Sequence, residues 1–256
     1  MKVFSFRLKS VLITAAVILA VVGSVLFVAS KVTDAVSAQA RMIPIYNVDT
    51  SSNKVAVTFN CANGTEDIGE ILSILDSYGV KATFFLLGSW ADAHIDEATK
   101  IYEAGHEIGS HSYSHHDMPS MSYEDILLDL QKCNTVLRNI TGENPVLFRA
   151  PSGSYDNKTI SAAEALEMVT VQWDVDSIDW KNIPAEEILK RVTTKVKRGS
   201  IIQLHTGTAH TAEALPEILS YLKNESFEAV TVSELILKDN YIIDSNGTQK
   251  ALKNGS

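Results

Sequence analysis

Short apolar runs alternate with amphipathic segments of helical period along residues 53–239 of this 256-residue chain. This alternation is typical of a parallel β-sheet whose strands are joined by crossover helices. The expected strands are Val55–Phe59, Ala82–Leu87, Glu107–Ser110, Val146–Arg149, Met168–Trp173, Ser200–Leu204 and Phe227–Thr231, and the expected helices include Ile68–Tyr78, Ser122–Ile140, Ala185–Val196 and Thr211–Leu222. The pattern predicts an α/β fold, either a closed barrel or a doubly wound open sheet, because periodicity alone does not separate the two.

Polar side chains that can carry chemistry follow these strands directly. They are Asn60 and Cys61 after the first strand, His111 and His115 after the third, Arg149 at the end of the fourth, Asp174, Asp176 and Asp179 after the fifth, and His205 after the sixth. In a parallel α/β fold, all of these strand ends open on one face. The sequence therefore predicts one functional site rather than several independent structural details.

The histidine pair suggests what this site holds. His111 and His115 are four residues apart, a spacing that places two imidazoles on one side of a helical turn, close enough to share a divalent ion. Two ordinary surface or hydrogen-bonded histidines are the alternative. The net charge of −9 argues against a nucleic-acid partner, since such a partner requires a basic surface.

The N-terminus predicts an attachment to the membrane. Lys2, Arg7 and Lys9 precede the uncharged run Val11–Ser30, and about 20 apolar residues suffice to cross a bilayer. We expect a cytoplasmic segment at 1–10, a transmembrane anchor at 11–30, a linker at 31–52, an extracytoplasmic domain at 53–239 and a flexible tail at 240–256. Cleavage of a signal peptide after Ala38-Gln39-Ala40, followed by secretion, is the alternative.

Five ordered motifs resemble the polysaccharide deacetylase family with its NodB-type domain. His111-Ser112-Tyr113-Ser114-His115 resembles the metal motif H-[ST]-x-x-x-H, and Arg149-Ala150-Pro151-Ser152-Gly153 resembles R-x-P-x-G. Asp176-Ser177-Ile178-Asp179-Trp180 resembles D-x-x-D-W, Ile202-Gln203-Leu204-His205 resembles L-x-x-H, and Lys81-Ala82-Thr83-Phe84-Phe85 matches the second strand. The resemblance implies a distorted (β/α)7 barrel and metal-assisted hydrolysis of N-acetyl groups on a sugar polymer.

The resemblance also implies roles for individual residues. His111 and His115 would bind Zn²⁺, with Co²⁺ as a substitute, and the backbone N–H of Ser152 would donate to the oxyanion. His205 would protonate the leaving amine, with Asp176 holding its imidazole in the correct tautomer. Leu204 and Trp180 would form an apolar floor for the acetyl methyl group, Trp180 being otherwise a core aromatic. The resemblance places Arg149 among the catalytic residues. The alternative is that Arg149 is a structural ion-pair partner.

The first motif departs from the family pattern T-F-D-D-G-P, reading Thr58-Phe59-Asn60-Cys61-Ala62-Asn63-Gly64. Asn60 stands where the family has its catalytic base and cannot accept a proton, and a general base contributes ~10²–10⁴-fold to a rate. Cys61 stands where the family has a metal-binding carboxylate. It is either a replacement thiolate ligand or a small apolar filler that leaves two protein ligands plus water. Recruitment of Glu66 or Asp67 as a base would rescue catalysis.

This altered motif resembles the PdaB-like sporulation branch of the family, which implies a peptidoglycan-related role at the membrane or at a forming spore wall. The leading expectation is a membrane-anchored deacetylase that acts on an N-acetylated glycan, with peptidoglycan as the substrate. The alternative is a catalytically impaired protein that binds cell-wall glycan without deacetylating it. The third possible function is metal-dependent hydrolysis of another amide or ester.

Overall fold

The computed structural model describes residues 21–24 and 41–252 of a chain that divides into two compact units, Met1–Arg41 and Met42–Ser256. Residues 21–24 of the first unit are helical. Among the described residues, no helix combines the length and apolar character needed to cross a membrane. The predicted cytoplasmic segment 1–10 and most of the predicted anchor 11–30 lie outside the described residues.

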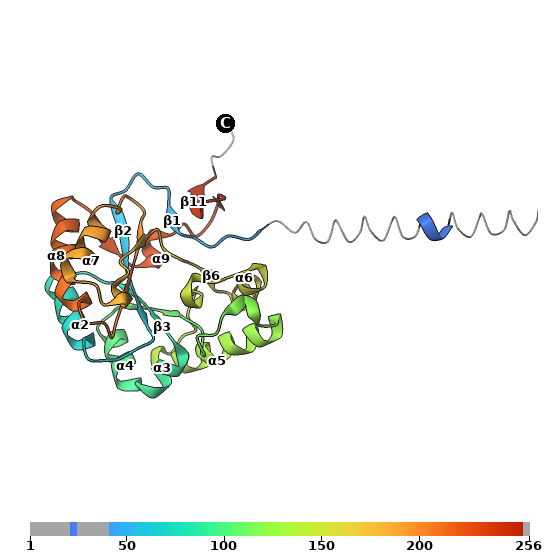
Figure 1. Cartoon of the computed structure of the whole chain (residues 1–256), viewed down its shortest axis with the longest axis horizontal. Coiled ribbons are helices and arrows are strands. Elements are labelled where there is room, and N and C mark those ends of the chain that lie inside the picture. The colour runs from blue at the N-terminus through green and yellow to red at the C-terminus, as the bar shows by residue number, and fades with distance from the viewer. Residues whose placement is uncertain (1–20, 25–40, 253–256) are drawn as a thin grey trace, which may run out of the picture. The chain divides into compact units, whose positions relative to one another are not determined.

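Parallel strands form the main sheet of the second unit (Figure 1). They are β2 (Lys54–Cys61), β3 (Thr83–Leu86), β4 (Glu107–Ser110), β5 (Leu147–Phe148), β6 (Val169–Thr170), β7 (Val175–Asp176), β8 (Ile201–His205) and β9 (Glu228–Val230). Their order is β6-β5-β4-β3-β2-β8-β7, with β9 also paired to β2, and every pairing is parallel. The predicted α/β class is confirmed, in the form of a half-barrel of parallel strands.

One predicted strand is interrupted by a bend. The expected strand Met168–Trp173 is reduced to β6, and a separate strand, β7, follows at Val175–Asp176. Between them, the Asp174 carboxylate accepts hydrogen bonds from the Ile201 N–H at 3.0 Å and the Ser200 hydroxyl at 3.1 Å. These contacts turn Asp174 toward the start of β8 and away from the strand ends, so the polar residue predicted at the site serves the backbone instead.

Helices cover the outside of the sheet (Figure 1). They are α2 (Ile68–Ser77), α3 (Gly88–Ala93), α4 (Ile95–Glu103), α5 (Tyr123–Thr141), α6 (Asn157–Glu164), α7 (Ala185–Thr193), α8 (Thr211–Asn224) and α9 (Val232–Leu235). The longest predicted helix is confirmed as α5, which begins after Ser122, whose hydroxyl accepts from the Asp125 N–H, and ends at Gly142 with φ 83°. Helices α3, α4 and α6 are not among the helices expected from the sequence.

Strand alternation sorts the side chains of β2 into two sets. Phe59 and Cys61, with the valines at alternate positions before them, are fully buried in the core between the sheet and the helices. Thr58 and Asn60 alternate with them and face the interior of the half-barrel. The same alternation on the neighbouring strands determines which residues after the strands can reach a common pocket.

The segments on either side of the predicted domain belong to the fold. The chain enters β1 (Asn47–Val48), which pairs with β11 (Thr248–Ala251), and β10 (Tyr241–Ile243) completes this second sheet. Ile45 is fully buried and makes backbone hydrogen bonds with residues on both sides of Val171. The predictions of a linker reaching residue 52 and a flexible tail starting at residue 240 are therefore wrong for residues 42–52 and 240–252. The first segment reaches the main sheet through bridges at Val171 and Ser200, and the second pairs with the first, which their polar composition does not predict.

We expect Ile45→Ala to lower the free energy of unfolding by about 2–5 kcal/mol, the usual cost of deleting a buried isoleucine side chain. Ile45 is 0% exposed and packs in the core cluster that contains Val171 and Phe85. Urea denaturation of the purified protein measures the change. Ile43→Ala, at a half-buried position two residues earlier, is the matched control and should cost clearly less. Equal and small effects at both positions would restore the interpretation of this segment as a linker.

His106 makes stability depend on pH. Burial lowers the pKa of its imidazole from 6.5 to about 4, and its Nδ1 accepts a hydrogen bond from the Ala82 N–H at 3.2 Å. The unfolded chain therefore binds a proton at this site below pH 6.5, whereas the folded chain does so only near pH 4. The stability that this neutral imidazole contributes is present above pH 6.5 and is lost as the pH falls toward 4.

We expect a loss of up to about 3 kcal/mol in the free energy of unfolding from this residue across that interval, taking about 1.4 kcal/mol per pKa unit. Urea midpoints measured from pH 7 to pH 4 test the effect. His106→Asn retains an acceptor for the Ala82 N–H but does not titrate, so its midpoint should fall less steeply with pH. A slope identical to that of the natural chain would contradict the assignment.

Candidate active site

The predicted strand-end residues converge on one pocket of about 350 Å³. Its walls come from the ends of β2, β6, β7 and β8 and from the loops after β4, β5 and β7. The lining residues are Asn60, Ala62, Asn63, His111, His115, Ser152, Trp173, Asp176, Trp180, Gln203 and His205. Seven of the predicted site residues are in this set, namely Asn60, His111, His115, Ser152, Asp176, Trp180 and His205. Arg149, Cys61 and Leu204 are not.

The two histidines lie on a loop rather than on a helical turn. β4 ends at Ser110, and the following residues include two with left-handed backbone conformations, Ser112 at φ 67° and His115 at φ 58°. The ring centroids of His111 and His115 are nevertheless 5.3 Å apart, in an edge-to-face arrangement. The predicted pair is therefore formed, but the geometry assumed for it was wrong. Loop curvature, not helical periodicity, brings the imidazoles together.

The chemistry of His111 is fixed by its surroundings. Its Nδ1 lies 2.8 Å from the Arg149 carbonyl oxygen, so this nitrogen carries the proton and Nε2 retains a free electron pair. Burial, followed by the neighbouring His115, lowers the pKa of His111 to about 3. A neutral imidazole with a free Nε2 is the form in which histidine binds a metal.

Asp129 on α5 holds the histidine loop in place. Its carboxylate accepts a hydrogen bond from the Tyr113 N–H at 2.8 Å and another from the Ser114 hydroxyl. The Ser112 hydroxyl accepts from the His115 N–H at 3.1 Å, which adds a second constraint inside the loop. Together these contacts stabilise a backbone that contains two left-handed residues.

The resemblance implies a zinc ion on His111 and His115, and on that expectation Asp129→Ala weakens zinc binding by about 10–100-fold, the range typical when residues that orient metal ligands are removed. The reason is that the loop would lose the acceptor for two of its donors and His115 would no longer be held beside His111. Competition with a chromophoric chelator measures the affinity. Glu124→Gln, an exposed change on the same helix, is the control and should leave the affinity unchanged. Equal affinities in the two variants would contradict the role.

Arg149 lies beneath the pocket and is fully buried. Its Nη1 donates to Thr58 Oγ1 at 2.8 Å and to Asn60 Oδ1 at 3.0 Å, and its Nη2 donates to the Gln172 carbonyl oxygen at 3.0 Å. The guanidinium also stacks on the Phe85 ring, 4.0 Å from its centroid. Burial lowers the pKa of Arg149 to about 9, which leaves the group charged at neutral pH. Arg149 therefore positions Asn60 from below instead of touching the pocket contents.

Cys61 does not reach the pocket. Because side chains alternate along β2, Asn60 faces the pocket and Cys61 points into the apolar core, where it is 0% exposed. Burial raises the pKa of its thiol to about 12, so the thiol stays protonated. A metal binds the thiolate form, and the interpretation of Cys61 as a metal ligand is therefore wrong. The structure supports its alternative, a small filler residue.

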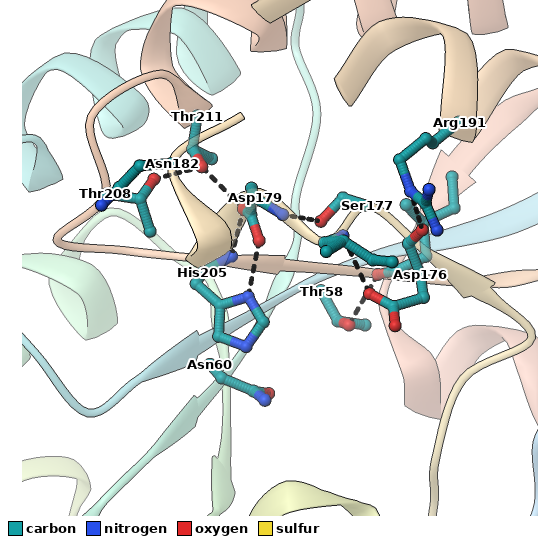
Figure 2. Close-up of polar contacts among 12 residues, drawn as sticks. Thr58, Asn60, Asp176, Ser177, Asp179, Asn182, Arg191, His205, Thr208 and Thr211 are labelled. Atoms are coloured by element: carbon teal, nitrogen blue, oxygen red, sulfur yellow. Dashed lines mark hydrogen bonds and ion pairs between the residues drawn. The ribbon is translucent and has the colours of Figure 1, made fainter. Parts of the chain in front are cut away.

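The general-acid candidate His205 is oriented by Asp179, not by Asp176. His205 Nδ1 is 2.7 Å from Asp179 Oδ1, and the His205 N–H donates to Asp179 Oδ2 at 2.8 Å (Figure 2). The Thr211 hydroxyl donates to the same carboxylate at 2.6 Å. Asp176 instead accepts the Ile178 N–H at 2.9 Å, so the predicted His205–Asp176 pair is wrong. Both aspartates belong to the D-x-x-D-W motif, whose spacing alone did not distinguish them.

The remaining wall residues are partly those predicted. Trp180 is 55% exposed at the pocket, which excludes the alternative of a core aromatic. Leu204 is 0% exposed and packs in the core, so its predicted place on the pocket floor is wrong. Gln203 faces the pocket instead, because it alternates with Leu204 on β8 and shares its side with His205. Trp173 was also missed, since it lies within an expected strand and not after one.

The donor set fits a divalent ion only in part. In the part of the chain that the structure describes, no three His, Cys, Asp or Glu side chains cluster in a way that could hold a metal ion. Two imidazoles are suitable ligands for zinc, but catalytic zinc sites usually have three protein ligands. Asp67, expected as a substitute base or charge, is held elsewhere and accepts the Gly207 N–H at 2.8 Å. Neither Glu66 nor Asp67 lines the pocket.

A parallel half-barrel with a histidine pair, a histidine–aspartate pair and a buried arginine at its strand ends defines the NodB-type class of carbohydrate-modifying domains. Comparison with known proteins assigns the family. The family model described as polysaccharide deacetylase matches residues 47–171 of this chain. A peptidoglycan-N-acetylglucosamine deacetylase of Bacillus cereus is 32% identical over 71% of this chain and 68% of its own length. The chain belongs to the polysaccharide deacetylase family, whose members are hydrolases acting on amide bonds.

Other relatives differ in length or in activity. YlxY of Bacillus subtilis is 39% identical over 75% of this chain, and the chain spans 60% of its length. The chain spans about 40% of PdaC of Bacillus subtilis, named a peptidoglycan-N-acetylmuramic acid deacetylase and 30% identical. The structure of BA3943 from Bacillus anthracis, described as a CE4 family pseudoenzyme, has a TM-score of 0.73 and 36% identity, covering 75% of this chain and 68% of that one. A mutant of BA3943 is described as having restored enzymatic activity.

Proposed function

We propose that this chain binds an N-acetylated cell-wall glycan, peptidoglycan in particular, in its strand-end pocket without deacetylating it efficiently. The observation that carries this proposal is the amide of Asn60, which lines the pocket and accepts a hydrogen bond from Arg149 at the position of the family's catalytic base. An amide cannot take the proton of an attacking water. The proposal thus favours the second of the functions expected from the sequence.

The pocket retains features that suit a sugar. Trp180 is 55% exposed and lines the pocket, as does Trp173, so apolar ring faces are available to the flat, C–H-rich face of a sugar ring. Gln203 and Asn63 add amide groups that can hydrogen-bond hydroxyl or acetamido groups. Relatives named for deacetylation of peptidoglycan support this substrate class, and the pseudoenzyme BA3943 supports loss of activity within the same fold.

The remaining machinery has identifiable roles. His111 and His115 would hold a divalent ion, Zn²⁺ or Co²⁺, and a bound ion supplies Lewis-acid polarisation of a carbonyl oxygen. His205 directs Nδ1 to Asp179, which leaves Nε2 toward Asn60 and the pocket (Figure 2). This geometry allows His205 to deliver a proton to a leaving amine. The Ser152 N–H, on a turn with φ 54°, is the candidate oxyanion donor.

Slow deacetylation is the second candidate function, and the His205–Asp179 pair is the specific observation that favours it. The general acid is oriented by a buried carboxylate at 2.7 Å, an arrangement with no evident purpose in simple glycan binding. Only the proton acceptor and the third metal ligand are missing. The expected rate is lower by the ~10²–10⁴-fold that a general base contributes.

Two measurements on the same purified protein separate these functions. Binding to insoluble peptidoglycan and to N-acetylglucosamine oligomers is measured by sedimentation and calorimetry, and acetate release is measured with Zn²⁺ or Co²⁺ present. Binding without acetate supports the proposal. Metal-dependent acetate release at a substantial rate would overturn it in favour of the enzyme, and absence of both binding and release would overturn both functions.

The location of the domain is part of the proposal. A peptidoglycan ligand requires the domain to lie outside the cytoplasmic membrane, and the uncharged run Val11–Ser30 after a basic N-terminus supports a single-pass anchor. Secretion after cleavage near Ala38-Gln39-Ala40 is the competing arrangement. Membrane fractionation with protease accessibility tests both, and expression timed against spore formation tests the sporulation role.

A further inference from the structure

Arg149 carries a buried positive charge that no carboxylate within the described residues neutralises. It is 0% exposed, and its hydrogen-bond acceptors, Thr58 Oγ1, Asn60 Oδ1 and the Gln172 carbonyl oxygen, are all uncharged. None of the ion pairs found within residues 21–24 and 41–252 includes it, and its Nε has no hydrogen-bond partner. A buried charge of this kind is costly unless an opposite charge compensates it.

Arg149 also determines which end of the Asn60 amide faces the pocket. A guanidinium only donates hydrogen bonds, so the contact at 3.0 Å requires the oxygen of Asn60 to point toward Arg149. The Nδ2 group is then free for the pocket that Asn60 lines together with His205. An aspartate at this position presents a negatively charged acceptor. Asn60 instead presents a donor above an uncompensated cation.

The negative charges near the pocket belong to Asp176 and Asp179, and both carboxylates already accept hydrogen bonds. Asp179 is committed to His205 and Thr211, and Asp176 accepts the Ile178 N–H on the wall formed by β7. His111 and His115 line the same pocket as Asn60 and contribute no negative charge. An anionic group of a ligand would therefore be most stable beside Asn60 and least stable beside Asp176.

We propose that the pocket binds a carboxylate, one oxygen of which accepts a hydrogen bond from Asn60 Nδ2 and supplies the counter-charge that Arg149 lacks. This inference rests on the proposed function in that it assigns the ligand chemistry of the same pocket. Two sources carry the group: a free small acid such as acetate, or the lactyl ether of N-acetylmuramic acid within a glycan. The substitution that removes the base thereby converts a water-activating position into an anion-binding one.

The test is a titration of the purified full chain with sodium acetate, N-acetylmuramic acid and N-acetylglucosamine. Binding is followed by calorimetry and by the fluorescence of the pocket tryptophans, first with a chelator present and then with Zn²⁺. The variant Asn60→Asp is expected to weaken binding of both carboxylates at least about 10-fold and to affect binding of the uncharged N-acetylglucosamine much less, since a fixed negative charge replaces the donor. The matched control is Asn63→Asp, which adds the same charge to the same pocket without a bond to Arg149.

Each outcome of these titrations either supports or overturns the inference. Carboxylate binding that weakens in Asn60→Asp much more than in Asn63→Asp supports the inference. A preference for N-acetylmuramic acid over N-acetylglucosamine then identifies the glycan as the source, and binding of acetate alone identifies a free acid. No carboxylate binding in either metal condition, or equal weakening by the two substitutions, overturns it. Binding of N-acetylglucosamine oligomers without carboxylate binding leaves the proposed function standing and rejects this inference alone.

Discussion

Asn60→Asp is expected to give metal-dependent acetate release from N-acetylglucosamine oligomers at a rate about 10²–10⁴-fold above that of the natural chain. The substitution is nearly isosteric, and the new carboxylate would take the place of the amide oxygen that now lies 3.0 Å from Arg149 Nη1. Arg149 would keep it ionised and oriented toward the pocket, where it can accept a proton from water. Acetate release with Zn²⁺ or Co²⁺ added measures the gain, and metal content is determined on the same sample.

The same variant has a second, independent readout. A carboxylate in place of Asn60 supplies the counter-ion that buried Arg149 lacks, so we expect the free energy of unfolding to rise by about 1.5–3 kcal/mol, the range for hydrogen bonds to charged groups. Asn63→Asp adds the same charge to the pocket without a hydrogen bond to Arg149, so it should give neither the gain in stability nor the gain in acetate release. An Asn60→Asp protein that is more stable and binds metal yet remains inert would show that the missing base is not the reason for inactivity.

The fold was largely predictable because its dominant signals are local. A buried parallel strand is a short apolar run, and a helix such as α5 carries a cap at Ser122, a helical stripe of apolar residues and a glycine stop. The bend at Asp174 was not predictable, since it depends on contacts with Ser200 and Ile201 at the start of another strand. The same holds for residues 42–52 and 240–252, whose pairing partners are remote in the sequence.

The sequence predicts which residues lie near the pocket, but not which of their side chains line it or form contacts with one another. The strand-end rule correctly brought Asn60, His111 and His205 to one pocket, because parallel strands share an exit face. Whether Leu204 or Gln203 faces that pocket depends on the register of β8, which fixes the face of every second residue. Gln203 lies two residues before His205, so strand alternation alone places it on the same side of β8 as His205. The burial of Cys61 follows from the same rule applied to β2.

The carboxylate partner of His205 is more difficult to predict from the sequence. Asp176 is the last residue of β7 and Asp179 follows it by three residues. The choice between them depends on the three-residue turn that begins at Asp179 and on the left-handed Ile178 before it. This turn aims Asp179 at the end of β8 and fixes Asp176 against the Ile178 N–H. A motif of two aspartates three residues apart contains no signal for such a turn. The distinction nevertheless has a large functional consequence.

In the Asn60→Asp background, Asp179→Asn is expected to lower acetate release by about 10²–10⁴-fold, whereas Asp176→Asn should lower it far less. Asp179 accepts from His205 Nδ1 at 2.7 Å and thereby leaves Nε2 available to exchange a proton with the substrate. An amide at position 179 can donate to Nδ1 and so favours the wrong tautomer, even though the shape of the site is preserved. Single-turnover acetate release from the two double variants measures the difference directly.

Asp179 also accepts from Thr211 and from the His205 N–H, so a loss of activity has to be separated from a loss of structure. Thr211→Val in the same background removes one of these structural contacts and leaves the imidazole contact intact. We expect it to lower the unfolding midpoint while retaining most of the activity. If Thr211→Val abolished acetate release as completely as Asp179→Asn, the carboxylate would act by holding the loop after β8 and not by orienting the proton donor. If Asp176→Asn produced the larger loss, the pairing seen in the structure would not be the one used in the reaction.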